Sequence, residues 1–202
     1  MLIHNYSEIK KPKNVVILGS NGFIGKSLSL KLESEGISLK KLSRTDINLL
    51  SDNASKSLAN YLSAEDVLVA TSAIAPCKDA DMLSDNIKMA IVISKAANIA
   101  GCSHVINVSS DAVYADVDHS ITENTIKSPD NFHGVMHLAR EIIFTNQINK
   151  ALTIVRPTLI FGEGDTHNGY GPNQFSRLAN NNKPIKLFGK GEERRDHIYI
   201  KD

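Results

Sequence analysis

Short apolar runs alternate with longer segments of helical periodicity along the chain. Four runs are nearly unbroken and four residues long, which is typical of parallel strands buried on both faces of a sheet; they cover residues 15–18, 67–70, 105–108 and 152–155. Weaker strand candidates cover residues 37–42 and 47–50. Helical spacing of apolar residues covers 23–35, 86–100 and 132–149, and Leu58, Tyr61 and Leu62 suggest a further helix face before the strand at 67–70. This alternation predicts an α/β fold, a doubly wound parallel sheet with helices on both faces.

A glycine-rich turn stands between the first predicted strand and the first predicted helix, where residues 19–25 read G-S-N-G-F-I-G. Gly19 permits a tight turn, Gly22 lets a phosphate approach the backbone, and Gly25 allows the helix to pack closely on the sheet. The free N–H groups at the start of the helix favour an anion. The turn predicts a dinucleotide site on a Rossmann-type sheet, with a glycine turn that binds nothing as the alternative.

Composition and charge narrow the class of protein. The chain has 202 residues, of which 42% are hydrophobic and 22% charged, as in ordinary globular proteins. A formal charge of +1 gives no electrostatic reason to expect nucleic acid or an anionic membrane as a partner. The first 13 residues are polar and no apolar run is long enough to span a bilayer. We therefore expect a cytoplasmic protein whose two cysteines, Cys77 and Cys102, are free thiols.

The spacing of the glycine turn, G-x-x-G-x-x-G, resembles that of the extended short-chain dehydrogenase/reductase family, also called the NAD-dependent epimerase/dehydratase family. The resemblance continues through Ser109 to Tyr114, through Arg156-Pro157, and from Arg194 to Asp202. It implies an NAD(P)-binding Rossmann domain over residues 1–160 and the start of a substrate-binding region over 161–202. Because family members continue further, the resemblance also implies that most of the substrate domain is missing. Many members act on nucleotide-linked sugars.

The end of the second predicted strand bears on the choice between NAD and NADP. An acidic residue there binds the ribose of NAD, whereas an arginine pairs with the extra phosphate of NADP. Arg44 lies nearest the strand end and favours NADP, unless it is a solvated surface charge. Asp46-Ile47 resembles the family's pair beside the adenine. The resemblance implies cofactor contacts at Gly19, Gly22, Phe23, Ile24, Gly25, Arg44, Asp46, Ile47, Ala70, Ser72, His137 and Pro157.

The resemblance also assigns residues to the substrate side. Ser110 takes the position of the family's catalytic serine or threonine, and Asp111 that of an acidic residue which assists in some members. Thr158 and Arg195 match substrate-binding positions, where an arginine often faces a sugar-nucleotide diphosphate. Tyr114 belongs to the strand-end signature and is interpreted as a packing aromatic. Ala112 stands where dehydratases carry a second acid, which argues for a reductase or epimerase.

The family's acid–base pair, Tyr-x-x-x-Lys, is replaced here by His133 and His137. Spacing of i, i+4 keeps both side chains on one helix face, but tyrosine and lysine titrate near pH 10 and histidine near 6.5. Three hypotheses follow. His133 retains proton transfer while His137 holds the ribose; or catalysis is lost and cofactor binding persists; or the two bind a metal. No third metal ligand is evident, so we expect none, and the presence of Ser110 favours retained redox chemistry.

The leading hypothesis is therefore an NAD(P)-dependent oxidoreductase or epimerase acting on a nucleotide-sugar. The alternative is a catalytically impaired dinucleotide-binding protein, such as a redox sensor or an interaction module. The helix predicted over residues 86–100 is apolar nearly all round, which predicts burial on two sides. Its second side either packs within the chain or forms a homodimer, as the resemblance implies.

Overall fold

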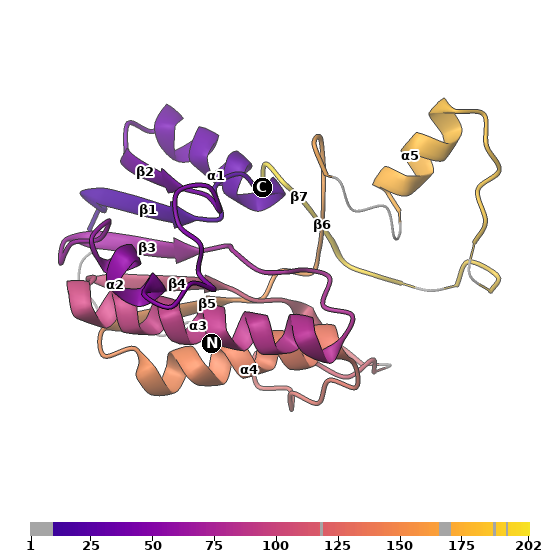
Figure 1. Ribbon diagram of the computed structural model, residues 1–202. Helices are drawn as coiled ribbons and strands as arrows, with labels where there is room; N and C mark the ends of the chain where they lie inside the picture. Colours follow the sequence, from indigo (N-terminus) through magenta and orange to yellow (C-terminus); the bar gives the residue numbers. More distant parts are fainter. Residues whose placement is uncertain (1–9, 118, 166–170, 188, 193) are drawn as a thin grey trace. The chain divides into compact units, whose positions relative to one another are not determined.

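The computed structural model describes residues 10–117, 119–165, 171–187, 189–192 and 194–202 (Figure 1). The chain forms two compact units, Met1–Arg156 and Pro157–Asp202. Each unit is considered by itself below. The predicted division at residue 160 stays a prediction.

The first unit contains a five-stranded parallel sheet in the order β2-β1-β3-β4-β5. Its strands are β1 (Asn14–Leu18), β2 (Ser38–Leu42), β3 (Asp66–Ala70), β4 (His104–Val108) and β5 (Ala151–Val155). Leu18 pairs with Leu42 on one side and with Ala70 on the other, so three strands end at the same level. The order of strands reverses between β1 and β3. In doubly wound sheets the crevice at such a reversal is where ligands bind.

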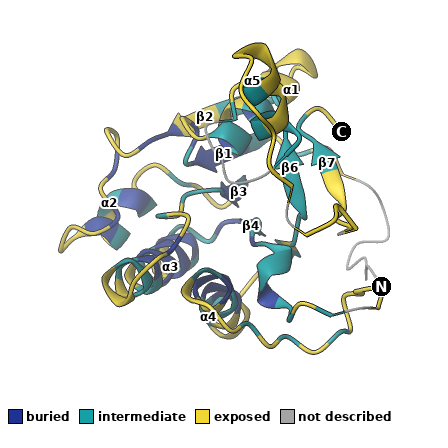
Figure 2. Cartoon of the chain, turned by 90° about the vertical axis from the view of Figure 1, so that its right-hand side faces the viewer, coloured by how far each residue is buried: buried dark blue, intermediate teal, exposed yellow. Residues whose placement is uncertain are grey.

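Helices cover both faces of this sheet. Side chains of α1 (Phe23–Ser34) pack on one face against β1, and α2 (Ala54–Ala59), α3 (Ala80–Ala100) and α4 (Phe132–Gln147) contribute to the core on the other. Buried residues concentrate in the strands and on the inner sides of α3 and α4 (Figure 2). The predicted fold class is confirmed. None of the described helices is long and apolar enough to cross a membrane.

The long helix α3 begins six residues earlier than its apolar pattern predicts. The Asp79 carboxylate accepts a hydrogen bond from the Met82 N–H (2.8 Å) and caps the helix there. At the other end Gly101 adopts φ +71°, the left-handed conformation that closes many helices. The added residues 80–85 mix apolar side chains (Ala80, Met82, Leu83) with polar ones (Asp81, Ser84, Asp85), so the helix start is set by the Asp79 cap. Much of the apolar surface of α3 packs within the chain, against the sheet, α2 and α4.

The strand predicted over residues 47–50 is wrong. The chain turns after β2 because the Asp46 carboxylate accepts hydrogen bonds from the N–H and hydroxyl of Ser43 (2.8 and 2.6 Å). The Ile47 N–H then donates to the Ser43 carbonyl. Ile47 and Leu49 are buried in the core, so the apolar alternation reflects burial of an irregular segment.

The second unit holds a parallel pair of short strands, β6 (Leu159–Phe161) and β7 (His197–Tyr199), and a helix, α5 (Asn173–Asn180). The rings of Phe161 and Tyr199 lie 5.5 Å apart across the pair. The loop predicted over residues 161–172 is described up to 165 and from 171, and its central part lies outside the described residues.

Two isoleucines of α3 give a matched test of the core. Ile93 is fully buried, whereas Ile99 is 62% exposed. We expect Ile93→Ala to lower the free energy of unfolding by about 2–5 kcal/mol, because it removes buried methylene groups and leaves a cavity. Ile99→Ala should change it by about 0.5 kcal/mol or less. Urea denaturation of both variants measures the difference, and equal losses would contradict this packing.

Candidate functional site

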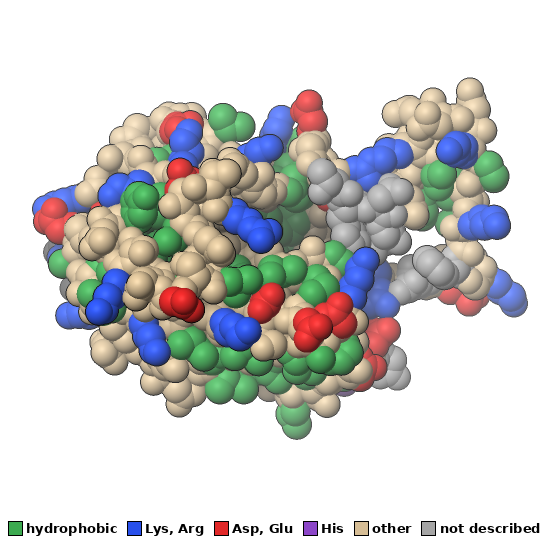
Figure 3. Space-filling model, viewed as in Figure 1, with side chains coloured by type: hydrophobic (Ala, Val, Ile, Leu, Met, Phe, Trp, Pro, Cys, Tyr) green, Lys and Arg blue, Asp and Glu red, His purple; other side chains and the backbone are tan. Residues whose placement is uncertain are grey.

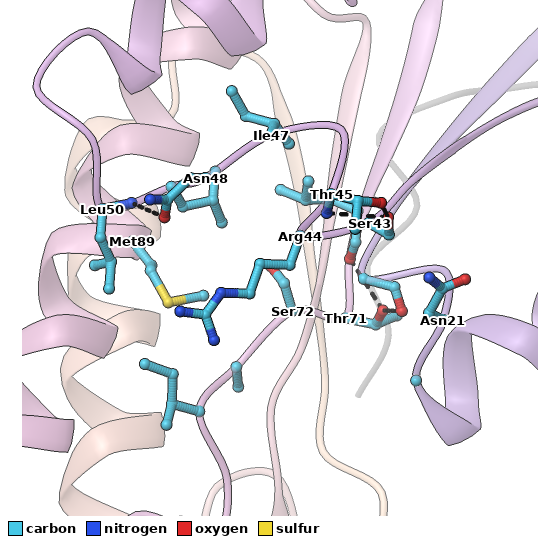
Figure 4. Close-up of a pocket in the computed structure, with 16 residues that line it drawn as sticks. Asn21, Ser43, Arg44, Thr45, Ile47, Asn48, Leu50, Thr71, Ser72 and Met89 are labelled. Carbon is cyan, nitrogen blue, oxygen red and sulfur yellow. Dashed lines mark hydrogen bonds between the residues drawn. The ribbon is translucent and has the colours of Figure 1, made fainter.

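A cleft of about 350 Å³ opens at the carboxyl ends of β1 and β3, where the strand order reverses (Figure 4). It is lined by Leu18, Gly19, Asn21, Gly22, Ser43, Arg44, Thr45, Ile47, Asn48, Leu49, Leu50, Thr71, Ser72, Ala73, Ile74 and Met89. Five of the predicted cofactor residues are among them, namely Gly19, Gly22, Arg44, Ile47 and Ser72.

The glycine turn is held by backbone contacts that a side chain would block. Gly19 has φ +97°, and a Cβ atom there would lie 2.7 Å from the Ser72 nitrogen. A Cβ atom on Gly25 would lie 2.3 Å from the Gly19 carbonyl oxygen, so this glycine allows α1 to start against the turn. The Gly19 N–H donates to the Leu42 carbonyl (2.8 Å), which ties the turn to the end of β2.

The start of α1 suits an anionic group. Gly22 caps the helix without any side-chain hydrogen bond, and the first turn carries no acidic residue. Helix geometry leaves the first N–H groups, including those of Phe23 and Ile24, without partners inside the helix. These donors and the partial positive charge of the helix end fit the pyrophosphate of a dinucleotide. The residues present therefore fit the cofactor that the sequence predicts.

After the end of β2, the two predicted cofactor residues Arg44 and Asp46 point in different directions. The Arg44 side chain extends into the cleft toward Met89 and Ser72 (Figure 4). Asp46 instead turns to Ser43, whose hydroxyl and N–H hold the pKa of the Asp46 carboxyl below its usual value. Asp46 shapes the turn and borders a second groove, between α1 and β2. The charged side chain that the segment after β2 presents to the cleft is thus a cation, Arg44.

The segment after β3 is fixed by its neighbours. Ala70 is fully buried at the strand end. The Thr71 hydroxyl donates to the Leu18 carbonyl (3.0 Å) across the sheet. On α3, the buried Asn86 side chain accepts from the Ile74 N–H and donates to the Ile74 carbonyl, both at 3.0 Å. The floor of the cleft is therefore rigidly placed by hydrogen bonds to its backbone.

Ser110 and Asp111 begin a short 3-10 helix, η1 (Asp111–Val113), just beyond β4. The Ser110 hydroxyl accepts from the Ala112 N–H and donates to the Asp111 carboxylate, both at 3.1 Å. These local bonds orient the hydroxyl that the sequence proposes as catalytic.

The two histidines lie together on α4, with their ring centres 4.8 Å apart and edge to face. Nδ1 of His133 accepts the Cys77 N–H (3.4 Å), so the neutral ring carries its proton on Nε2. His137 is 7% exposed and its Nδ1 has no hydrogen-bond partner. Burial, together with the nearby His133 and Arg140, lowers the pKa of His137 to about 3. His137 is therefore uncharged at neutral pH.

No group of three or more histidine, cysteine, aspartate or glutamate side chains suited to a metal occurs among the described residues. The pair on α4 is thus not joined by a third such ligand within that part of the chain.

Sequence reasoning missed an ion pair behind the histidines. Glu141 is 3% exposed; its carboxylate accepts two hydrogen bonds from Arg156 (2.8 and 2.9 Å) and one from the Ser109 hydroxyl (2.6 Å). Arg156 also donates to the Tyr114 hydroxyl (3.0 Å) and lies over its ring. Tyr114 is thus held by Arg156, and its interpretation as a packing aromatic stays a prediction. Arg140, also missed, is fully buried beside His137.

Pro157, Thr158 and Arg195 belong to the second unit. The Thr158 hydroxyl donates to the Asp196 carbonyl, and Nδ1 of His197 lies 3.1 Å from the Arg195 carbonyl. These contacts are all internal to that unit, so the proposed roles of the three residues stay predictions.

The fold and the glycine turn define a dinucleotide-binding α/β protein. A model of the NAD dependent epimerase/dehydratase family matches residues 15–202, and the chain belongs to this family. The resemblance found in the sequence is confirmed. "Uncharacterized UDP-glucose epimerase YtcB" of Bacillus subtilis (strain 168) is 26% identical over 219 residues, which cover 98% of this chain. The chain spans 65% of the length of that relative.

Solved structures support the fold. The UDP-N-acetylglucosamine 4-epimerase from Bacillus cereus matches with a TM-score of 0.80 at 22% identity, over 94% of this chain and 70% of the other. MoeE5 in complex with UDP-glucose and NAD matches with a TM-score of 0.77 at 21% identity, over 93% and 68%.

Because His137 is buried in its neutral form, we expect acid to lower the stability of the fold. Its folded-state pKa of about 3 lies below the unfolded value of about 6.5, so the unfolded chain binds the proton more readily. Stability should fall as the pH drops from about 6.5 toward 3, by up to about 1.4 kcal/mol per pH unit from this group. Urea denaturation at several pH values should show a shallower dependence in His137→Gln.

The exposed His119 provides the control for this measurement. His119→Gln should keep the pH dependence of the unmodified chain. An identical dependence in His137→Gln would mean that His137 is not held neutral in the folded protein.

Proposed function

We propose that the protein is an NAD(P)-dependent oxidoreductase or epimerase acting on a nucleotide-sugar. The observation that carries this is the glycine turn at the cleft between β1 and β3, which opens a helix whose N-cap makes no side-chain hydrogen bond. The relative named a UDP-glucose epimerase and the similar structure that holds UDP-glucose and NAD support the substrate class. Because the chain spans only part of its relatives, activity, substrate and partners are all part of this proposal.

The bound dinucleotide would supply or accept hydride at C4 of its nicotinamide. The N–H groups at the start of α1 would hold the pyrophosphate, and Ile47 would contact the adenine. On the reacting side, Ser110 would hydrogen-bond the substrate oxygen, and its orientation by Asp111 supports that role. His133 would present its Nε2–H to the same oxygen. The neutral His137 would hydrogen-bond the nicotinamide ribose, with Pro157, Thr158 and Arg195 as further contacts.

A second candidate is a binding protein with impaired catalysis, and the state of the two histidines favours it. Proton uptake by His133 puts a proton on Nδ1, which must then give up its hydrogen bond from the Cys77 N–H. His137 carries no charge with which to lower the pKa of a neighbouring acid. Both features oppose acid–base catalysis but leave cofactor binding intact.

NADP is the proposed cofactor, with NAD as the alternative. Arg44 is the charged side chain that enters the cleft, and an arginine at this strand end pairs with the 2′-phosphate of NADP. The similar structure with bound NAD keeps the alternative open.

A cytoplasmic homodimer is part of the same proposal. Hydrophobic side chains gather over α3 and α4 (Figure 3), and Ile99, Phe132, Val135 and Ile142 are among the exposed ones. Twofold dimers are the commonest oligomers, and such a face suits one.

Titration of the protein with NADPH and NADH, followed by cofactor fluorescence, tests binding, and incubation with candidate nucleotide-sugars then tests turnover. We expect binding in either case, and turnover only if the proposed enzyme activity is correct. The double variant His133→Tyr, His137→Lys supplies the family's pair. Activity that appears only in this variant would favour the impaired binder, and a chain that binds neither nucleotide would refute both candidates.

Arg44→Ala tests the choice of cofactor. We expect about a tenfold loss of affinity for NADPH, because a charge-assisted hydrogen bond to phosphate contributes roughly 1.5–3 kcal/mol. Affinity for NADH should change little. Lys40→Ala, another exposed cation of β2, is the control. Equal losses for the two nucleotides in Arg44→Ala would show that Arg44 does not read the 2′-phosphate.

A further inference from the structure

Arg140 is a buried cation without a matching anion. It is 1% exposed, and its Nη2 donates to the Ser72 carbonyl (3.0 Å). The guanidinium carbon lies 5.7 Å from the centre of the Phe144 ring. Its Nε and Nη1 have no hydrogen-bond partner, and no carboxylate among the described residues pairs with it. The adjacent Glu141 is already bound to Arg156.

Other buried polar atoms around Arg140 also lack partners. They are the Ser72 hydroxyl, both side-chain polar atoms of Asn107, and Nδ1 of His137. Ala70 pairs with Asn107 across β3 and β4, and Ser72 follows two residues later, so these side chains share the sheet face under α4. His137 and Arg140 are three residues apart on one side of the helix. None of these neighbours carries a negative charge.

The positive charge persists under physiological conditions. Burial lowers the pKa of Arg140 to about 10, which still leaves it protonated at neutral pH. A charge that is removed from water and lacks a counter-ion acts strongly on nearby groups, because the local dielectric is low. The charge lies one residue behind the cleft wall, because the carbonyl that Arg140 binds belongs to Ser72, a lining residue.

We propose that Arg140 is a positioning residue that supplies the positive charge at the nicotinamide end of the cofactor site, acting through His137 and the Ser72 carbonyl, and that it makes the site prefer the reduced dinucleotide. The inference rests on the proposed function and deepens it. An oxidised nicotinamide ring is cationic and a reduced one is neutral, so a fixed cation disfavours the oxidised form. The neutral His137 stands where the resemblance implies a charged lysine.

This preference bears on the class of reaction. A reductase starts from the reduced dinucleotide and delivers a hydride and a proton to a carbonyl, which leaves an alcohol and the oxidised dinucleotide. An epimerase of this kind must start from the oxidised form. The buried charge therefore favours reduction of a carbonyl on a nucleotide-sugar.

The test is the ratio of dissociation constants for oxidised and reduced dinucleotide, measured by calorimetry with NADP⁺ against NADPH and with NAD⁺ against NADH. We expect the unmodified protein to bind the reduced form about tenfold more tightly, the effect of one unit charge at an effective dielectric near 20 and a separation of about 12 Å. Arg140→Met should bring the ratio close to one. Arg140→Lys should keep it, because it retains the charge. Lys95→Met, which removes an exposed cation from α3, should also leave the ratio unchanged.

The ratio separates a charge effect from a structural one. Equal weakening of both forms in Arg140→Met, with the ratio unchanged, would mean that Arg140 only supports the fold. A ratio of oxidised to reduced dissociation constants at or below one in the unmodified protein would overturn the proposal. This measurement needs no variant, so the proposal can be tested even if Arg140→Met does not fold. Binding of neither form would instead refute the proposed function, and this inference with it.

Discussion

The carboxylate of Glu141 joins the parts of the first unit on which the reacting side of the site depends. It accepts hydrogen bonds from Ser109 at the end of β4 and from Arg156 just after β5, while itself belonging to α4. Removing one partner from a buried ion pair costs several kcal/mol because it leaves an unpaired buried charge, so the arrangement of the three elements depends on both Glu141 and Arg156 being present. Arg156 extends the connection to Tyr114 beyond η1. Ser110 and the two histidines are thereby placed in one rigid frame.

The cofactor side of the site is built on a different principle, because it depends on the backbone and on the absence of side chains. Gly19 and Gly25 are required where a Cβ atom would meet the backbone at less than 3 Å. The start of α1 then presents free backbone N–H groups to an anion, whichever side chains follow in the helix. This explains why dinucleotide binding can be inferred from the sequence directly, whereas catalysis depends on the particular side chains of α4.

The sequence predicted the five strands of the sheet, the three long helices that cover it, a helix face at Leu58 that falls in α2, and the glycine turn, because buried parallel strands and amphipathic helices leave clear periodic patterns. It failed where polar contacts decide the structure. The Asp79 cap starts α3 six residues before its continuous apolar pattern, and the contacts between Ser43 and Asp46 turn an apolar segment away from the sheet. Arginine in a helix ordinarily indicates a surface, so the burial of Arg140 is visible only once β3 and α4 are brought together.

On α4 the positive charge lies at position 140 and not at position 137, where the family resemblance implies a lysine. Position 137 carries a neutral imidazole, and the nearest buried cation is Arg140, about one helical turn further along. A guanidinium that is 1% exposed cannot reach a ribose hydroxyl, so its influence on a ligand is electrostatic and not a direct contact. On the proposed function, a dinucleotide would therefore be held chiefly by the glycine turn, the start of α1 and Arg44, at its pyrophosphate and adenosine end. On the two proposals together, one half of the site would fix the cofactor through the backbone, and the other would set the electrostatic environment of its reacting ring.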